Sequence, residues 1–273
     1  MIRRAPARLS REMMKKFVSG GVQGEMPFLD HLEELRWRIL WSLLALIVGS
    51  VVGFILVDRM NAMELLIRPI EPFLNGGKLK YLSPTDPFFV TIKLSLLAGV
   101  VLASPIIIYQ VWAFLAPALM PSEKRVIVPA LYMGVVLFVI GVAMSYELVL
   151  PMTLKFTMGF QTKFLEQSIV IGPYMAMVTR LLLAFGVVFE LPVVILILSA
   201  LGLVTPEFLA SKRRHAIAAI TVLASVLTPG DVITVTLMMM VPLILLYEFS
   251  ILLSRLVARR RVANAAAAAA AEA

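Results

Sequence analysis

The stretch ILWSLLALIVGSVVGFILV, residues 39–57, holds nineteen consecutive residues without a charge. A helix needs about 20 mostly apolar residues to cross the roughly 30 Å hydrocarbon core of a bilayer, so this stretch is long enough. The composition of the whole chain agrees, because 60% of its 273 residues are hydrophobic, 15% are charged and the mean hydropathy is +0.94. Residues 39–57 therefore predict an integral membrane protein.

Five further apolar segments follow along the chain. They are residues 94–115, 126–146, 169–204, 216–227 and 232–247, and the turn sequence Thr228-Pro229-Gly230-Asp231 separates the last two. The last two offer short uncharged runs, which as helices would reach only about 18 and 24 Å. We therefore predict an all-α integral membrane protein of six transmembrane helices, with helices five and six too short for a full bilayer.

The basic residues predict the orientation of these helices. Of the 25 lysines and arginines, 17 fall on one side, in the N-terminal segment, the 116–125 and 205–215 loops and the C-terminal tail. The loops of the other side carry 6. Because the more basic side of a membrane protein faces the cytoplasm, we expect both termini to be cytoplasmic. The basic residues flank apolar segments, so they indicate lipid headgroups as partners, with no nucleic acid.

Several function classes are excluded or disfavoured by what the sequence lacks. It has no cysteine, which excludes disulfides, thiolate metal sites and cysteine nucleophiles. The two histidines, His31 and His215, lie far apart, and HExxH, phosphate-loop and GxSxG motifs are missing. We therefore predict that the protein is not an enzyme and has no metal or cofactor.

Charged residues inside the predicted spans are candidate functional sites, because a charge in the membrane is costly. Glu190 is the main candidate, and Arg180 lies ten residues before it, too far along one helix for a direct pair. Pro192 frees the carbonyl group of Val188, so we expect a kink or hydration there. A small-molecule transporter lined by Glu190 and Arg180 is one alternative. Glu248 could equally be functional or simply pair within the protein.

Four motifs flank the predicted helices. In chain order they are residues 28–38 (FLDHLEELRWR), 83–89 (SPTDPFF), 109–119 (YQVWAFLAPAL) ahead of Glu123, and 227–231 (LTPGD). In this order and on these faces they resemble TatC, the signal-peptide receptor family of the twin-arginine translocation system. The resemblance covers about Met26 to Arg255. It divides the chain into a basic extension (1–25), a six-span domain (26–255) and a basic, then alanine-rich tail (256–273).

The resemblance implies a receptor in the cytoplasmic (inner) membrane with a concave, cupped bundle of helices. TatC proteins bind twin-arginine signal peptides of folded precursors at the cytoplasmic face. They organise TatA-like and TatB-like single-span partners, self-associate, and use the proton-motive force for export. By resemblance, the signal peptide is bound by Glu34, Arg36 and Glu123. The resemblance also assigns an intramembrane polar or partner site to Glu190, a periplasmic role to Asp231, and structural roles to Pro69 and Phe114.

Two positions depart from the family pattern. Gly230 stands where a second proline is often found, and Val235 stands where some relatives carry glutamine. The second departure weakens the case for a polar cluster at the start of the last helix. The three tryptophans, Trp37, Trp41 and Trp112, are read as lipid-facing or interfacial side chains.

Overall fold

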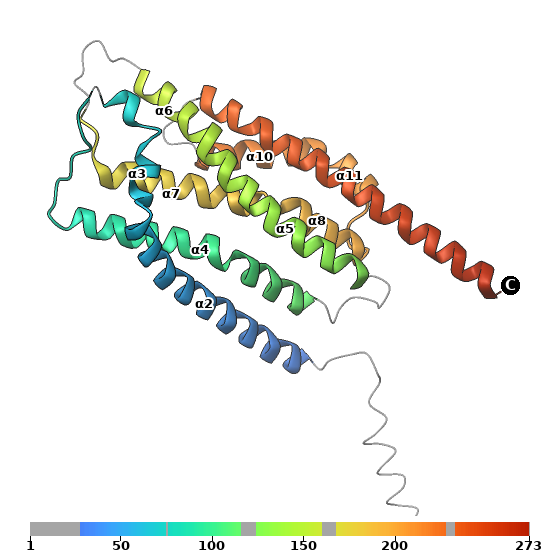
Figure 1. The fold of residues 1–273 in the computed structure, drawn as a ribbon. Coiled ribbons are helices and arrows are strands. Elements are labelled where there is room, and N and C mark those ends of the chain that lie inside the picture. Colours follow the sequence, from blue (N-terminus) through green and yellow to red (C-terminus); the bar gives the residue numbers. More distant parts are fainter. Residues whose placement is uncertain (1–27, 75, 116–123, 160–167, 228–232, 273) are drawn as a thin grey trace, which may run out of the picture. The chain divides into compact units, whose positions relative to one another are not determined.

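The computed structural model describes residues 28–74, 76–115, 124–159, 168–227 and 233–272, and these are mostly helical (Figure 1). By its internal contacts the chain divides into Met1–Trp37 and Arg38–Ala273, and the packing described below lies within the second unit. Apart from an isolated bridge between Lys80 and Val170, the described residues form no strand. The predicted all-α fold is confirmed.

The helical elements fall into long helices and shorter pieces that continue or connect them. The long helices are α2 (Phe28–Arg59), α4 (Asp86–Leu115), α5 (Lys124–Met144), α7 (Ile171–Val188) and α11 (Ile233–Glu272). The shorter pieces are α3 (Ala62–Ile67), the 3-10 helix η1 (Glu71–Phe73), the π-helix η3 (Ser145–Val149), α6 (Leu150–Gly159), α8 (Leu191–Ala200), α9 (Pro206–Ser211) and α10 (Arg213–Leu227). The elements η3 and α6 prolong α5, and α8 follows α7 after a two-residue turn.

Five segments of the described chain are long and apolar enough to cross a bilayer. They are Asp30–Arg59, Asp86–Leu115, Pro129–Gly159, Ile171–Ala200 and Val235–Arg259. The chain is therefore a multi-pass membrane protein. The predicted fifth span forms α10, whose 15 residues reach about 22 Å. A short fifth helix is thus confirmed, while the count of six spans stays a prediction.

The prediction of a short last helix is wrong. Helix α11 is 40 residues long and continues through Glu248 and Arg255. Those two charged side chains end the uncharged run, but both are exposed and both residue types are good helix formers, so the backbone stays helical beyond them. The alanine-rich tail up to Glu272 is helical too.

Helix α7 is at the centre of the larger core cluster. It packs against α4 and α5, and Met175, Val178, Leu181 and Phe185 on it are fully buried. Helices α8 and α10 both pack against α11, and α10 also contacts α7. Burying an apolar side chain in this way excludes lipid as well as water, so the gain comes from close packing of side chains more than from the hydrophobic effect.

Glycines let α2 approach α4 closely. A side chain at Gly49 would place its Cβ 2.8 Å from the carbonyl oxygen of Gly99, and one at Gly53 would come 2.6 Å from that of Ser95. Gly49 and Gly53 form a GxxxG pattern, which in membranes brings two helix backbones into contact. The first helix is therefore held to the bundle by its small-residue face, while its large apolar side chains, such as Phe54, remain exposed as lipid-facing residues are.

The connection between α2 and α4 is tied to the ends of other helices. The hydroxyl groups of Tyr146 and Tyr174 donate hydrogen bonds to the carbonyl groups of Leu65 and Leu66 in α3, each at 2.6 Å. Half-buried Pro69 follows Arg68, the residue that caps the end of α3. This predicted external segment is thus fixed to η3 and α7 by side chains, and Pro69 lies where its ring restricts the turn out of α3.

Candidate functional site

The residues predicted to bind signal peptide lie partly outside the described chain. Glu34 and Arg36 are on α2, with Glu34 half-buried and Arg36 exposed. The Nδ1 atom of His31 lies 4.0 Å from Oε2 of Glu34, one turn before it. Glu123 and Asp231 fall outside the described residues, so the expected approach of Glu34 and Glu123 stays a prediction.

An unexpected polar contact joins two of the sequence motifs. Arg38, one of the basic residues on the predicted cytoplasmic side, donates a hydrogen bond from Nη1 to Oε1 of Gln110 at 3.1 Å. Gln110 is buried on α4, and Phe114, one turn further on, is half-buried. A polar amide within an otherwise apolar span was the signal for this partner. The contact links the start of the first span to the end of the second.

Trp112 corrects the reading of the tryptophans. Trp37 and Trp41 are more than half exposed, as expected of lipid-facing or interfacial residues, but Trp112 is only 3% exposed. It packs in a smaller core cluster with Ala130 of α5 and Val193 of α8. The prediction of an interfacial Trp112 is wrong because α4 is covered by α5 at this point.

Glu190 lies at a break in its span. Helix α7 ends at Val188 and α8 begins at Leu191, so Glu190 occupies the turn between them and Pro192 falls in the first turn of α8. The amide of Glu190 donates to the carbonyl group of Val187 instead of continuing the α-helical pattern. The predicted kink is therefore present, because a proline at 192 cannot donate to Val188.

The carboxyl group of Glu190 is held in a slot between helices. It is close to Gly134 of α5, where an added Cβ would lie 3.0 Å from Oε2 of Glu190 and 3.3 Å from Cγ2 of Ile108 on α4. Oε1 is buried and has no hydrogen-bond partner among the described residues. Arg180 is exposed on α7 and forms no ion pair with it. The slot thus offers Glu190 room but leaves one oxygen unsatisfied.

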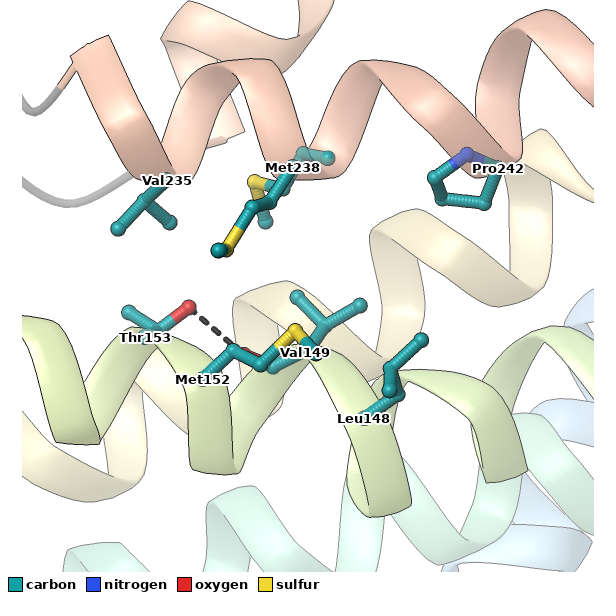
Figure 2. A pocket seen from close by; sticks show the side chains of 8 residues that line it. Leu148, Val149, Met152, Thr153, Val235, Met238 and Pro242 are labelled. Carbon is teal, nitrogen blue, oxygen red and sulfur yellow. Dashed lines mark hydrogen bonds between the residues drawn. The ribbon is translucent and has the colours of Figure 1, made fainter.

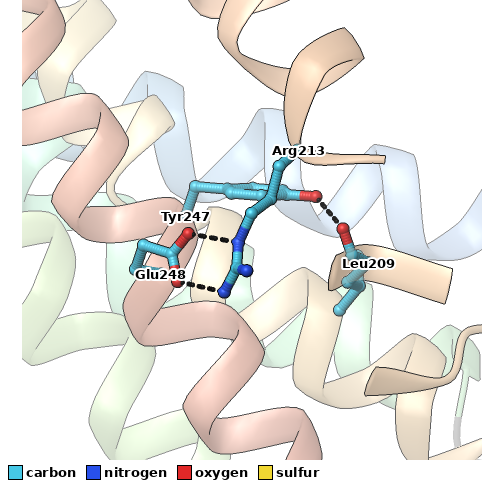
Figure 3. Close-up of polar contacts among 4 residues, drawn as sticks. All are labelled: Leu209, Arg213, Tyr247 and Glu248. Carbon is cyan, nitrogen blue, oxygen red and sulfur yellow. Dashed lines mark hydrogen bonds and ion pairs between the residues drawn. The ribbon is translucent and has the colours of Figure 1, made fainter. Parts of the chain in front are cut away.

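Glu248, by contrast, is paired. Its two carboxylate oxygens accept hydrogen bonds from Nε and Nη2 of Arg213 at 2.7 and 2.9 Å, a two-pronged ion pair (Figure 3). Beside it, the hydroxyl group of Tyr247 donates to the carbonyl group of Leu209 at 2.7 Å. Glu248 therefore fastens the α9–α10 corner to α11.

A small cavity opens between α11 and the η3–α6 segment (Figure 2). Its lining side chains come from Val235, Met238 and Met239 on α11 and from Leu148, Val149 and Met152 opposite, with Pro242 and Thr153 at its edges. Thr153 donates its hydroxyl hydrogen to the carbonyl group of Val149 and is satisfied locally. Buried Val235 thus adds apolar surface here.

The described residues hold no group of three His, Asp or Glu side chains that could bind a metal ion. Their polar features are the unsatisfied carboxyl group of Glu190, the paired one of Glu248 and the Arg38–Gln110 contact. A lone buried carboxyl group can accept or donate a hydrogen bond to an incoming side chain. These features suit a membrane protein that binds other polypeptides.

Comparison with known proteins agrees with this reading. The family model of the Sec-independent protein translocase protein TatC matches residues 30–242. A TatC from Aquifex aeolicus is 38% identical over 238 residues, which are 86% of this chain and 98% of the relative. The TatC of Escherichia coli is 36% identical over 236 residues, 86% of this chain and 90% of the relative.

A solved structure is similar as well. The crystal structure of a twin-arginine translocase receptor, TatC, superposes with a TM-score of 0.73 at 38% sequence identity and covers 84% of this chain and 99% of its own. At this identity the likeness extends beyond the fold to the family. With matching motifs, helices and relatives over most of its length, this chain belongs to the TatC family and is a component of a Sec-independent protein translocase.

Proposed function

We propose that this protein is the receptor subunit of a twin-arginine translocase and binds the twin-arginine signal peptides of folded precursors at the cytoplasmic face of the inner membrane. The observation that carries the proposal is the match to a solved TatC receptor over 84% of the chain. Glu34 and Arg36, in the first motif, lie within the matched residues, as does Glu123. Membership of a transport family argues against an enzyme.

Carboxylates are the side chains suited to the two arginines of such a signal peptide. A guanidinium group presents parallel N–H donors that match the two oxygens of a carboxylate. Glu34 and Glu123 are acids within segments of net positive charge, so each would attract one cation of the peptide. A small-molecule transporter would instead concentrate its acids near the middle of the membrane.

The test is photo-crosslinking of a twin-arginine signal peptide to the protein in membranes. Hydrogen bonds to charged groups contribute about 1.5–3 kcal/mol each, so Glu34→Ala or Glu123→Ala should weaken binding about tenfold or more. Glu33→Ala, an exposed neighbour on the same helix, is the matched control and should bind normally. Wild-type crosslinking by the Glu34→Ala, Glu123→Ala double variant would show that the arginines bind elsewhere.

Glu190 serves a different step in this proposal. It lies within a span, far from a peptide at the membrane surface, and its buried Oε1 lacks a partner among the described residues. We infer that a polar side chain of a TatA-like or TatB-like single-span helix satisfies it during assembly or proton-driven transport. Interhelical hydrogen bonds in membranes contribute about 0.6–2 kcal/mol, enough to bias which helix binds.

The short length of helix α10 favours a role in translocation. At about 22 Å it is shorter than the hydrocarbon core, so lipid beside it has to thin or the helix ends have to draw polar groups inward. A thinner bilayer lowers the barrier to moving a folded protein past this surface. Asp231 follows α10 on the predicted periplasmic side, outside the described residues.

A further inference from the structure

The corner between α9 and α10 carries four consecutive basic or titratable side chains, Lys212, Arg213, Arg214 and His215, all of them exposed. It lies on the predicted cytoplasmic face. Positive charge on this face is expected, but the depth of the corner relative to the ends of the neighbouring helices is not. Three side-chain contacts to α11 give that depth.

The first contact marks the end of α8. The hydroxyl groups of Ser199 on α8 and Ser254 on α11 hydrogen-bond at 2.7 Å, so α8 ends level with residue 254 of α11. The other two mark the corner, because Leu209 is bonded to Tyr247 and Arg213 to Glu248. Six residues separate Glu248 from Ser254, about 9 Å along a helix. The chain thus turns back after α8, and the corner contacts α11 about 9 Å nearer the middle of that span than the end of α8 does.

The surroundings of the corner are apolar on the outside. Leu203 and Phe208, which precede it, are 71% and 52% exposed, and Ile217, one turn into α10, is 42% exposed. Exposed apolar side chains therefore flank the basic residues on both sides along the chain, as expected where a corner borders lipid.

Acidic side chains of the protein neutralise only part of this basic cluster. Glu248 neutralises Arg213, while Nζ of Lys212 lies 5.9 Å from the ring centre of Phe208. Among the described residues no carboxylate is within ion-pair distance of Lys212 or Arg214. Two cations set below the neighbouring helix ends and flanked by apolar groups require anions from outside the protein.

We propose that Lys212 and Arg214 bind the phosphate groups of anionic phospholipids and draw the headgroups of the cytoplasmic leaflet inward at the α9–α10 corner. Anionic lipid is the source that fits, because the flanking Phe208 and Ile217 can contact acyl chains while the cations bind phosphate. The Tyr247–Leu209 hydrogen bond and the Arg213–Glu248 pair together hold the corner against α11. The binding of headgroups at this corner also places thinned lipid beside the short α10.

The test is lipid retention by the detergent-solubilised full-length protein, titrated with phosphatidylglycerol and measured by native mass spectrometry. At about fivefold per basic residue, Lys212→Gln with Arg214→Gln should weaken phosphatidylglycerol binding about 30-fold. Phosphatidylcholine, with no net charge, should bind weakly to the wild-type protein and to the double variant. The charge-conserving pair Lys212→Arg with Arg214→Lys should retain binding and shows that the fold tolerates changes here.

The matched control removes two exposed arginines from the same face, Arg255→Gln with Arg259→Gln on α11. It should lose far less affinity, since α11 holds those residues beyond the end of α8. Equal losses in the two double variants would overturn the proposal, because the effect would then be net charge alone. Full competition by inorganic phosphate at the lipid concentration would also overturn it, in favour of a general anion site.

Discussion

Glu190 and Glu248 are both acids within apolar spans, yet their surroundings in the protein are opposite. Glu248 is half exposed on α11 and is held by two hydrogen bonds from Arg213. Glu190 lies in the turn between α7 and α8, with a buried oxygen that has no partner among the described residues. A carboxyl group in the membrane is costly, and within the described chain only Glu248 has an ion-pair partner that offsets this cost.

The difference separates a structural acid from a functional one. A paired acid contributes to the local fold, and its removal leaves an exposed arginine that lipid headgroups can satisfy. An unsatisfied buried acid is retained at a cost to stability, which indicates that something outside this part of the chain uses it. The predictions below test whether Glu190 and Glu248 really differ in this way.

The largest effect is expected from Glu190→Ala. If a partner helix hydrogen-bonds to this carboxyl group, its loss should weaken partner binding about 3- to 30-fold and reduce precursor transport accordingly. Signal-peptide crosslinking should stay at the wild-type level, because Glu190 is within a span. Glu190→Gln should be milder, since an amide still hydrogen-bonds. Paired assays of crosslinking and transport in the same membranes measure both.

Arg180→Gln is the control for this experiment, because it removes an exposed charge from the same span. Transport should be almost unchanged by it. If Arg180→Gln is as damaging as Glu190→Ala, the two would act as a pathway and the transporter alternative would regain support. Loss of signal-peptide binding in folded Glu190→Ala protein would instead place Glu190 in recognition.

A smaller effect is expected from Gly134→Ala, which crowds the slot without touching the acid. The new Cβ would lie 3.0 Å from Oε2 of Glu190, closer than ordinary contacts allow, so the carboxyl group has to move. We expect a several-fold loss of transport with normal insertion into the membrane. Gly172→Ala is the matched control, since nothing lies within 4 Å of a Cβ there.

A second substitution distinguishes positioning from general damage. Glu190→Asp shortens the side chain by one methylene group and should partly restore transport in the Gly134→Ala background, because it gives the crowded carboxyl group room. Rescue of this kind is not expected if alanine merely disturbs the packing of α5. Unchanged transport by Gly134→Ala alone would mean that the position of the carboxyl group is not critical.

Most of the fold could be predicted from the sequence. Long uncharged runs such as residues 39–57 predict spans by length alone, and the sequence of residues 228–231 predicts the division between the last two helices. The length of α11 could not be predicted in this way, because charge patterns mark where a helix leaves the apolar phase and not where its hydrogen bonding ends. Likewise Trp112 reads as interfacial until the covering helix is known.

The site was only partly predictable. A proline two residues after Glu190 indicated the kink, and the acid itself stood out in an apolar run. That Gly134 makes room for it depends on how α5 packs on α7, which a residue pattern does not encode. The Arg38–Gln110 and Arg213–Glu248 contacts join residues 72 and 35 positions apart, so which charge pairs with which partner follows from packing alone.

The smallest effect is expected from the paired acid. Glu248→Gln removes the ion pair with Arg213, but exposed pairs contribute little to stability, so the midpoint of thermal unfolding in detergent should fall by no more than about 2 °C. Transport should remain near the wild-type level. Exchanging the charges, with Arg213→Glu and Glu248→Arg together, should recover the lost stability because the same two side chains can pair again. If Glu248→Gln abolishes transport in a folded protein that still binds signal peptide, then Glu248 is functional despite its partner, and satisfied pairing no longer distinguishes it from Glu190.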